Sequence, residues 1–118
     1  MRDHRSLEAW KEARTVVLGA LELARTNWKP YAAALFSQLQ RASLSVQLNI
    51  AEGYAYANTP SFGRHLLIAY GSAVETGELL EIAIDAEIVA ESVARELLTS
   101  NQRSQRLLLG LIKWRRSL

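Results

Sequence analysis

Residues 38–56 constrain the fold more than any other part of this 118-residue chain. On a helix at 100° per residue, their polar side chains form one narrow stripe with apolar side chains on both sides. The stripe consists of Gln38, Arg41, Ser45, Asn49, Glu52 and Tyr56. One apolar flank is Leu35, Leu39, Ala42, Val46 and Ile50, and the other is Leu44, Leu48, Ala51 and Ala55. Because two apolar flanks need two packing surfaces, we take the second flank as a candidate subunit interface.

The rest of the chain is also helical in composition. It has two prolines and six glycines, is rich in Ala, Leu, Glu and Arg, and shows no alternating β pattern. We expect one all-α domain over residues 1–118, with helices at about 7–26, 31–57, 60–86 and 90–114. Short connections between long helices favour an antiparallel up-down-up-down four-helix bundle.

The expected helix boundaries have unequal support. Ser6 suits an N-cap for the first helix, and Pro30 ends it by disfavouring helical geometry at the preceding residue. Thr59 suits a cap for the third helix, with Pro60 at its first position. Residues 87–92 contain no Gly or Pro; we place a break there because one helix over residues 60–116 would be about 85 Å long.

The apolar periodicity predicts which faces are buried. In the first helix the core face is Leu7, Trp10, Val17, Leu21 and Ala24; Trp28 is expected to fold onto the bundle end. In the fourth helix, heptad spacing selects Val93, Leu97, Ser100, Ser104, Leu107, Leu111 and Trp114. In the third helix Ser72 and Glu75 fall inside the apolar arc, which predicts that both are partly buried.

Charge is distributed unevenly along the chain, although the net charge is only +2. Residues 1–74 carry +3, residues 75–96 carry −6 and residues 97–118 carry +5. The basic residues of the last segment are Arg103, Arg106, Lys113, Arg115 and Arg116. Two interpretations stay open: a surface that contacts phosphates, and a solvated helix end whose cations suit the negative end of the helix dipole.

The sequence offers little for catalysis or metal binding. There is no cysteine, and neither His4 nor His65 sits in the Glu-x-x-His pattern of di-iron bundles. Phosphate-binding glycine loops and nucleophile-elbow motifs are absent. We therefore expect no enzyme and no cofactor. Without a membrane-length apolar run or a secretory leader, we also expect a cytoplasmic protein that spans no membrane.

The remaining candidate site is polar. It combines Arg41, Ser45, Asn49 and Glu52 of the second helix with Ser72 and Glu75 of the third, where Gly71 is expected to permit a close helix approach. Two nearby carboxylates can serve acid–base chemistry, and the cluster can also bind a ligand. The interpretation we favour is a structural network that fixes helix register or subunit orientation, with Arg41 paired to a carboxylate.

These residues resemble a known family, the 23S rRNA intervening-sequence proteins, also called S23-like proteins. The matching segments are residues 7–10 (Leu-Glu-Ala-Trp), 38–42 (Gln-Leu-Gln-Arg-Ala), 45–53 (Ser-Val-Gln-Leu-Asn-Ile-Ala-Glu-Gly), Gly71-Ser72 with Glu75, and 109–113 (Leu-Gly-Leu-Ile-Lys). Three positions depart from the family pattern: Gln47 replaces a proline expected to kink the helix, Gln40 replaces an arginine, and Gly77 replaces a larger residue.

The resemblance implies a left-handed four-helix bundle that assembles into a homopentameric ring and has no established enzymatic activity. It also implies kinship with accessory proteins of diversity-generating retroelements, whose similar pentamers bind nucleic acid and a reverse transcriptase. We therefore expect a self-assembling protein that binds structured RNA or DNA through its basic residues. The alternative is an oligomeric scaffold for a protein partner, with no direct nucleic-acid contact.

Overall fold

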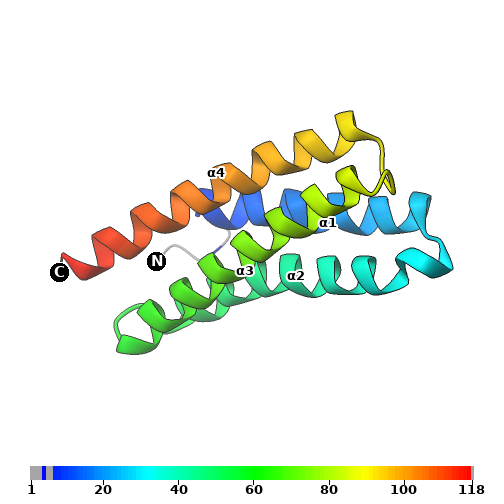
Figure 1. The fold of residues 1–118 in the computed structure, drawn as a ribbon. Coiled ribbons are helices and arrows are strands. Elements are labelled where there is room, and N and C mark those ends of the chain that lie inside the picture. The colour runs from blue at the N-terminus through cyan, green and yellow to red at the C-terminus, as the bar shows by residue number, and fades with distance from the viewer. Residues whose placement is uncertain (1–3, 5–6, 118) are drawn as a thin grey trace.

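The computed structural model describes residues 4 and 7–117. Four helices run alternately up and down a body of 46 × 20 × 20 Å (Figure 1). They are α1 (Glu8–Asn27), α2 (Ala33–Ala55), α3 (Pro60–Asp85) and α4 (Glu91–Arg116), with a short 3₁₀ turn, Pro30–Ala32, before α2. No β-strand occurs in this part of the chain. The all-α four-helix bundle expected from the sequence is confirmed.

Each helix packs against its neighbours in sequence, and α4 returns to α1 to close the bundle. Across the described residues, the diagonal pairs α1–α3 and α2–α4 make no close contact. α2 continues without a break through Gln47, the position where the family pattern has proline. Because the connections are only a few residues long, each helix runs antiparallel to the one before it.

The helix ends follow the prolines closely. α1 ends at Asn27, before the extended residues that lead into Pro30, and α3 begins at Pro60. Thr59 occupies the N-cap position of α3, but its hydroxyl donates to Tyr56 O at 2.8 Å, which closes the α2–α3 turn instead of capping the helix. The cap position of α1 is Leu7, which makes no side-chain cap bond. Ser6, expected as that cap, lies outside the described residues.

The α3–α4 connection, residues 86–90, falls at the expected place and turns without glycine. Glu87 adopts the left-handed conformation, with φ of 57°. The Ile88 N–H then donates to Ala83 O at 2.9 Å, which satisfies a carbonyl in the last turn of α3. A left-handed L-residue costs roughly 1–2 kcal/mol, so this turn carries strain that glycine would avoid.

The core consists of two apolar clusters separated by buried polar residues. The cluster nearer the α3–α4 turn contains Phe36, Leu39 and Leu80; the cluster nearer the α2–α3 turn contains Ile50, Leu66 and Leu108. The side chains between them form what we call the polar waist. Its members, all buried, are Ser43, Gln47, Thr76, Ser100, Asn101 and Ser104.

Several expected core positions are exposed instead. Leu21 and Trp114 are each about half exposed, so neither is buried in the core. In α4, Val93 and Leu107 face outward, while Leu97, Ser100 and Ser104 are buried as expected. The remaining inward positions of α4 are Ala94, Leu98, Asn101, Leu108 and Ile112. The heptad pattern failed because a straight helix drifts away from a 3.5-residue repeat, and because it passed over Ala94 and Asn101.

Candidate functional site

A seam of polar side chains joins α2 to α3. The Ser45 and Ser72 hydroxyls lie 2.8 Å apart, so one donates to the other across the helix boundary. Asn49 Nδ2 donates to Ser45 O at 2.8 Å, which directs Asn49 Oδ1 toward α3. There Oδ1 accepts from His65 Nδ1 at 2.9 Å. These bonds fix the register of the two antiparallel helices.

Two further residues shape the seam. The Tyr56 ring stacks on His65 at a centroid distance of 6.3 Å. Gly53 allows the close approach at this point, since a Cβ there would lie 2.7 Å from His65 Cβ. We expected Gly71 to serve that purpose, but it faces open space. The glycine of the Asn-Ile-Ala-Glu-Gly segment, not that of Gly-Ser, therefore permits the helix contact.

The charged members expected in this network lie outside the seam. Arg41 and Glu52 are exposed, and neither has an oppositely charged partner within 4.0 Å among the described residues. Glu75 is also exposed, not partly buried, and accepts a bond from Gln38 Nε2. Ser45 and Asn49 lie on the side of the stripe that meets α3, whereas Arg41 and Glu52 lie on its solvent side. The two carboxylates therefore share no buried site.

Two functional features of the α2–α3 boundary escaped the sequence reasoning. His65 lies seven residues before Ser72 and so on the same face of α3, a spacing that identifies it as a seam residue. Gln38 belongs to the polar stripe of α2 but was not assigned to the network. Both signals are periodicities that can be read from the sequence.

The polar waist holds a second contact between helices. Asn101 of α4 donates from Nδ2 to Ala73 O of α3 at 2.9 Å, and its side chain is almost fully buried. Gly77 stands beside it, and a Cβ at that position would lie 3.2 Å from Asn101 Nδ2. The glycine that departs from the family pattern therefore makes room for the amide. The Ser104 hydroxyl, also in the waist, has no hydrogen-bond partner among the described atoms.

The five basic residues of the C-terminal segment have different surroundings. Arg103 pairs with Glu12 of α1 at 3.2 Å. Arg115 Nη2 donates to Thr59 O at 3.1 Å, which ties α4 to the α2–α3 turn. Arg106, Lys113 and Arg116 are exposed, with no carboxylate of the described chain within 4.0 Å.

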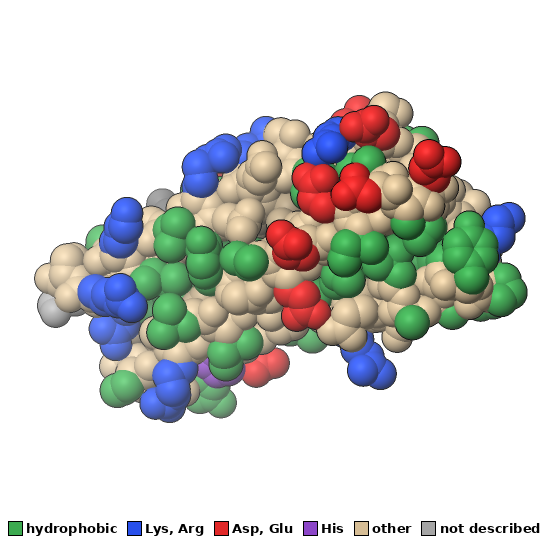
Figure 2. All heavy atoms as spheres, in the orientation of Figure 1, with side chains coloured by type: hydrophobic (Ala, Val, Ile, Leu, Met, Phe, Trp, Pro, Cys, Tyr) green, Lys and Arg blue, Asp and Glu red, His purple; other side chains and the backbone are tan. Residues whose placement is uncertain are grey.

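Opposite charges gather toward opposite ends of the bundle. We call segments 7–18, 43–74 and 98–117 the basic end; they carry eight basic and three acidic side chains. We call segments 19–42 and 75–97 the acidic end; they carry four basic and eight acidic side chains. Figure 2 shows Lys and Arg collected toward the end that holds the C-terminus, and most Asp and Glu over the other half.

The candidate interface residues lie on the outer face of α2. Leu44 and Leu48 are exposed, Ala55 is exposed and Ala51 is half-buried. The seam register places Leu48 level with Ile68 of α3, which is also about half exposed. We call Leu44, Leu48 and Ile68 the outer apolar band. It extends beyond the flank expected from α2 alone.

Within the described chain, no three His, Asp or Glu side chains gather in a way that could hold a metal ion. Among the helices described, none is both long and apolar enough to cross a membrane. The arrangement therefore offers hydrogen-bonded helix contacts, free cations and exposed apolar residues.

Comparison with known proteins gives that bundle a family. The sequence profile of the 23S rRNA-intervening sequence protein family matches residues 5–110, so the chain belongs to this family. The resemblance seen in the sequence is thereby confirmed. Neither this family description nor that of the structural relative below states an enzymatic activity. No curated protein matches the chain.

A solved structure has a similar fold. It is a protein with unknown function from the S23 ribosomal protein family, from Bacteroides thetaiotaomicron VPI-5482. The two align with a TM-score of 0.64 and 24% sequence identity, over 86% of this chain and 98% of that one. At this identity the likeness shows the shared fold alone.

Proposed function

We propose that this protein is a non-enzymatic, self-assembling helical bundle that binds structured RNA or DNA through the basic ends of the subunits of a homopentameric ring. The observation that carries the proposal is the free charge of Arg106, Lys113 and Arg116 at the basic end. Lys and Arg that face solvent without a carboxylate partner release counterions from phosphates on binding, which supplies most of non-specific nucleic-acid affinity.

The positions of these cations support the same conclusion. Arg103, Arg106 and Lys113 lie on the outward side of α4, opposite its buried residues Leu108 and Ile112. Arg103 and Arg106 are three residues apart and Arg106 and Lys113 are seven apart, so the three line one face along about three turns of the helix. A phosphate backbone can follow such a row without penetrating the bundle.

The outer apolar band supports self-assembly. Leu48 and Ile68 are each about half exposed and lie level on adjacent helices. Covering them in a subunit contact removes apolar surface from water at about 25 cal/mol per Å². Repetition also helps binding, because several weak basic surfaces linked in one particle bind a long polymer far more tightly than one.

Solution mass by light scattering tests both parts of the proposal. The protein alone should have a mass near five subunits, and it should gain tRNA or duplex DNA at low salt and release it at high salt. A monomer would contradict the ring. A pentamer that ignores both nucleic acids would contradict nucleic-acid binding and favour a scaffold for another protein.

A matched pair of triple variants locates the binding surface. Arg106→Gln/Lys113→Gln/Arg116→Gln should weaken binding and lower the slope of log K against log [salt] by about 0.9 for each phosphate that is no longer neutralised. Arg25→Gln/Lys29→Gln/Arg95→Gln changes the net charge equally, but at the acidic end, and should retain most of the affinity. Equal losses of affinity in both variants would show that only net charge matters.

A further inference from the structure

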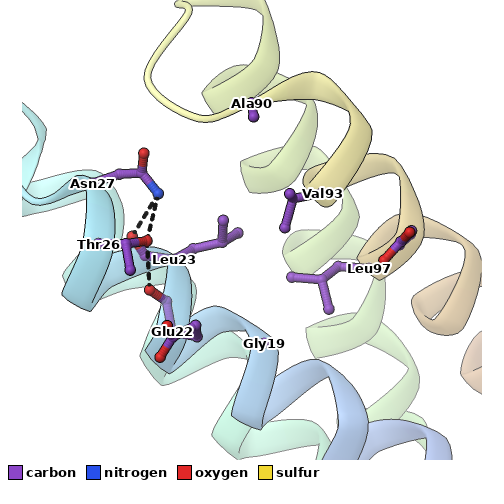
Figure 3. Close-up of a pocket in the computed structure, with 9 residues that line it drawn as sticks. Gly19, Glu22, Leu23, Thr26, Asn27, Ala90, Val93 and Leu97 are labelled. Atoms are coloured by element: carbon purple, nitrogen blue, oxygen red, sulfur yellow. Dashed lines mark hydrogen bonds between the residues drawn. The ribbon is translucent and has the colours of Figure 1, made fainter.

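An apolar groove opens between α1 and α4 at the acidic end (Figure 3). Its volume is about 420 Å³, within the range of small-ligand sites. Leu23 of α1 and Val93 and Leu97 of α4 line it, with Glu22 and Glu96 among its other lining residues. Val93 is 47% exposed, an unusual position for a valine on a helix that faces another helix.

Local chemistry keeps the groove apolar. Gly19 lets the two helices approach, since a Cβ there would lie 2.2 Å from Leu97 Cδ2. Its polar neighbours bond within α1: Thr26 Oγ1 donates to Glu22 O at 2.9 Å, and Asn27 Nδ2 donates to Leu23 O at 3.1 Å. Figure 3 shows these bonds directed along α1. The groove therefore presents apolar surface with few polar groups that need partners.

Negative charge surrounds the groove. Glu96 has no cation within 4.0 Å in the described chain, and the acidic end as a whole carries eight acidic and four basic side chains. Glu22 is held by Arg25, whose hydrogen bond lowers the pKa of the Glu22 carboxyl, so that carboxyl stays ionised. An apolar knob flanked by cations is the complementary partner.

The chain carries such a knob at its other end. Trp114 is 55% exposed, and the adjacent Lys113 and the nearby Arg116 have no carboxylate within 4.0 Å among the described residues. Trp28 is equally exposed, but it belongs to the acidic end, where like charge opposes docking onto a second acidic end. Tryptophan is also among the residues that most often anchor protein interfaces.

We propose that the groove between α1 and α4 receives Trp114 and the basic α4 terminus of a second copy of this chain. Groove and knob lie at opposite ends, so the contact is head-to-tail and leaves one groove and one knob free to continue. It uses neither the outer apolar band nor nucleic acid. It therefore adds to any lateral ring and does not depend on one.

Sedimentation equilibrium without nucleic acid tests the contact. At high salt the protein should show the mass of its lateral assembly; at low salt the mass should grow with concentration, because screening weakens the contact between exposed charges. No growth at low salt at any concentration would overturn the proposal. Leaving nucleic acid out means that the result does not depend on the proposed function.

Two substitutions at exposed positions test the groove and the knob separately. Trp114→Ala and Val93→Gln should each weaken the low-salt association about tenfold or more, as expected when an aromatic anchor or its pocket is removed. Their matched controls, Trp28→Ala and Ile82→Gln, change residues of similar exposure outside the contact and should leave the association unchanged. If the mass of the Trp114→Ala variant still grows with concentration at low salt, the assignment of Trp114 as the knob is wrong.

Mixing the two variants gives the decisive result. The Trp114→Ala protein keeps an intact groove and the Val93→Gln protein keeps an intact knob, so together they can form one contact but cannot propagate. The mixture should restore pairs of lateral assemblies that neither variant forms alone. A mixture that behaves as the sum of its parts would contradict a specific head-to-tail contact.

Discussion

The acidic and basic ends carry opposite excess charges, and at each end some of the less numerous charges are paired in salt bridges. At the acidic end, two of the four cations are held by carboxylates: Arg25 pairs with Glu22, and Arg95 lies 2.9 Å from Glu81. At the basic end, two of the three carboxylates are held by cations: Glu8 by Lys11 and Glu12 by Arg103. At each end, some of the less numerous charges form ion pairs with their neighbours, and an excess of the other sign remains.

That difference between the ends is not explained by stability. Exposed ion pairs contribute little to folding, and the unpaired majority charges repel one another. The two apolar clusters beneath the ends have similar compositions. Both contain buried leucine, phenylalanine, alanine and valine, and isoleucine is buried in one and packs against the other. The two ends therefore differ in surface charge, which other molecules contact, and have similar apolar cores.

The largest expected effect tests whether the two clusters are equivalent. Leu66→Ala at the basic end and Leu80→Ala at the acidic end each remove a fully buried side chain. Each should lower the free energy of unfolding by about 2–5 kcal/mol in urea titrations, because a cavity remains.

Hydrogen exchange sharpens this comparison. If the polar waist lets the ends open separately, each substitution should accelerate exchange mainly at its own end. Uniform acceleration over both ends would show that the bundle opens as one unit. A loss of unfolding free energy below about 1 kcal/mol for either variant would contradict its assignment to the core.

A smaller effect is expected in the waist between the ends. Asn101→Ala removes the bond to Ala73 O and leaves that buried carbonyl without its donor, which should cost about 1–3 kcal/mol of unfolding free energy. The exposed neighbour Gln102→Ala serves as the control and should change stability by less than about 0.5 kcal/mol. Equal melting temperatures for the two variants would show that the amide contributes nothing.

The ion pair that ties α4 to α1 should contribute still less. A double-mutant cycle over Glu12→Gln and Arg103→Gln should give a coupling of about 0.2–1 kcal/mol, since Arg103 is half exposed. The coupling should shrink as salt is added. A coupling that persists in high salt would mean that the pair is held by more than charge.

The smallest effect concerns pH at the acidic end. The hydrogen bond from Arg25 lowers the pKa of Glu22 below its ordinary value of about 4.3. Its stabilising contribution is therefore complete above that value and is lost as pH falls through the lower pKa of the folded protein. Glu22→Gln should remove this small pH dependence of the melting temperature, which calorimetry can follow against Glu78→Gln as the control.

The two inter-helix turns at the ends of α3 show what the sequence could predict. Pro60 marked the start of α3 correctly, because proline at the first helical position sacrifices no hydrogen bond. The turn at Glu87 had no residue signature, and helix length alone placed it. The left-handed conformation of Glu87 was not predicted, because residues 86–90 contain neither Gly nor Asn, the residues that usually adopt it.

Some of the polar contacts could be predicted from the sequence and others could not. Ser45, Asn49 and Ser72 were predicted from periodicity, because short polar side chains at a helix boundary have only the facing helix to meet. Asn101 was not predicted, since its partner is a main-chain carbonyl that no side-chain pattern marks. The exposure of Trp114 was likewise missed, because its neighbours in space could not be known from heptad spacing.

The opposite excess charges at the ends give this molecule a large electric dipole along its 46 Å axis, although its formal net charge is only +2. Bulk charge is therefore a poor guide to its behaviour at surfaces. Near a polyanion the molecule orients with α4's C-terminus inward, and near a polycation it reverses. A single preparation should bind both sulfonate and quaternary-ammonium resins at low ionic strength, each through a different end.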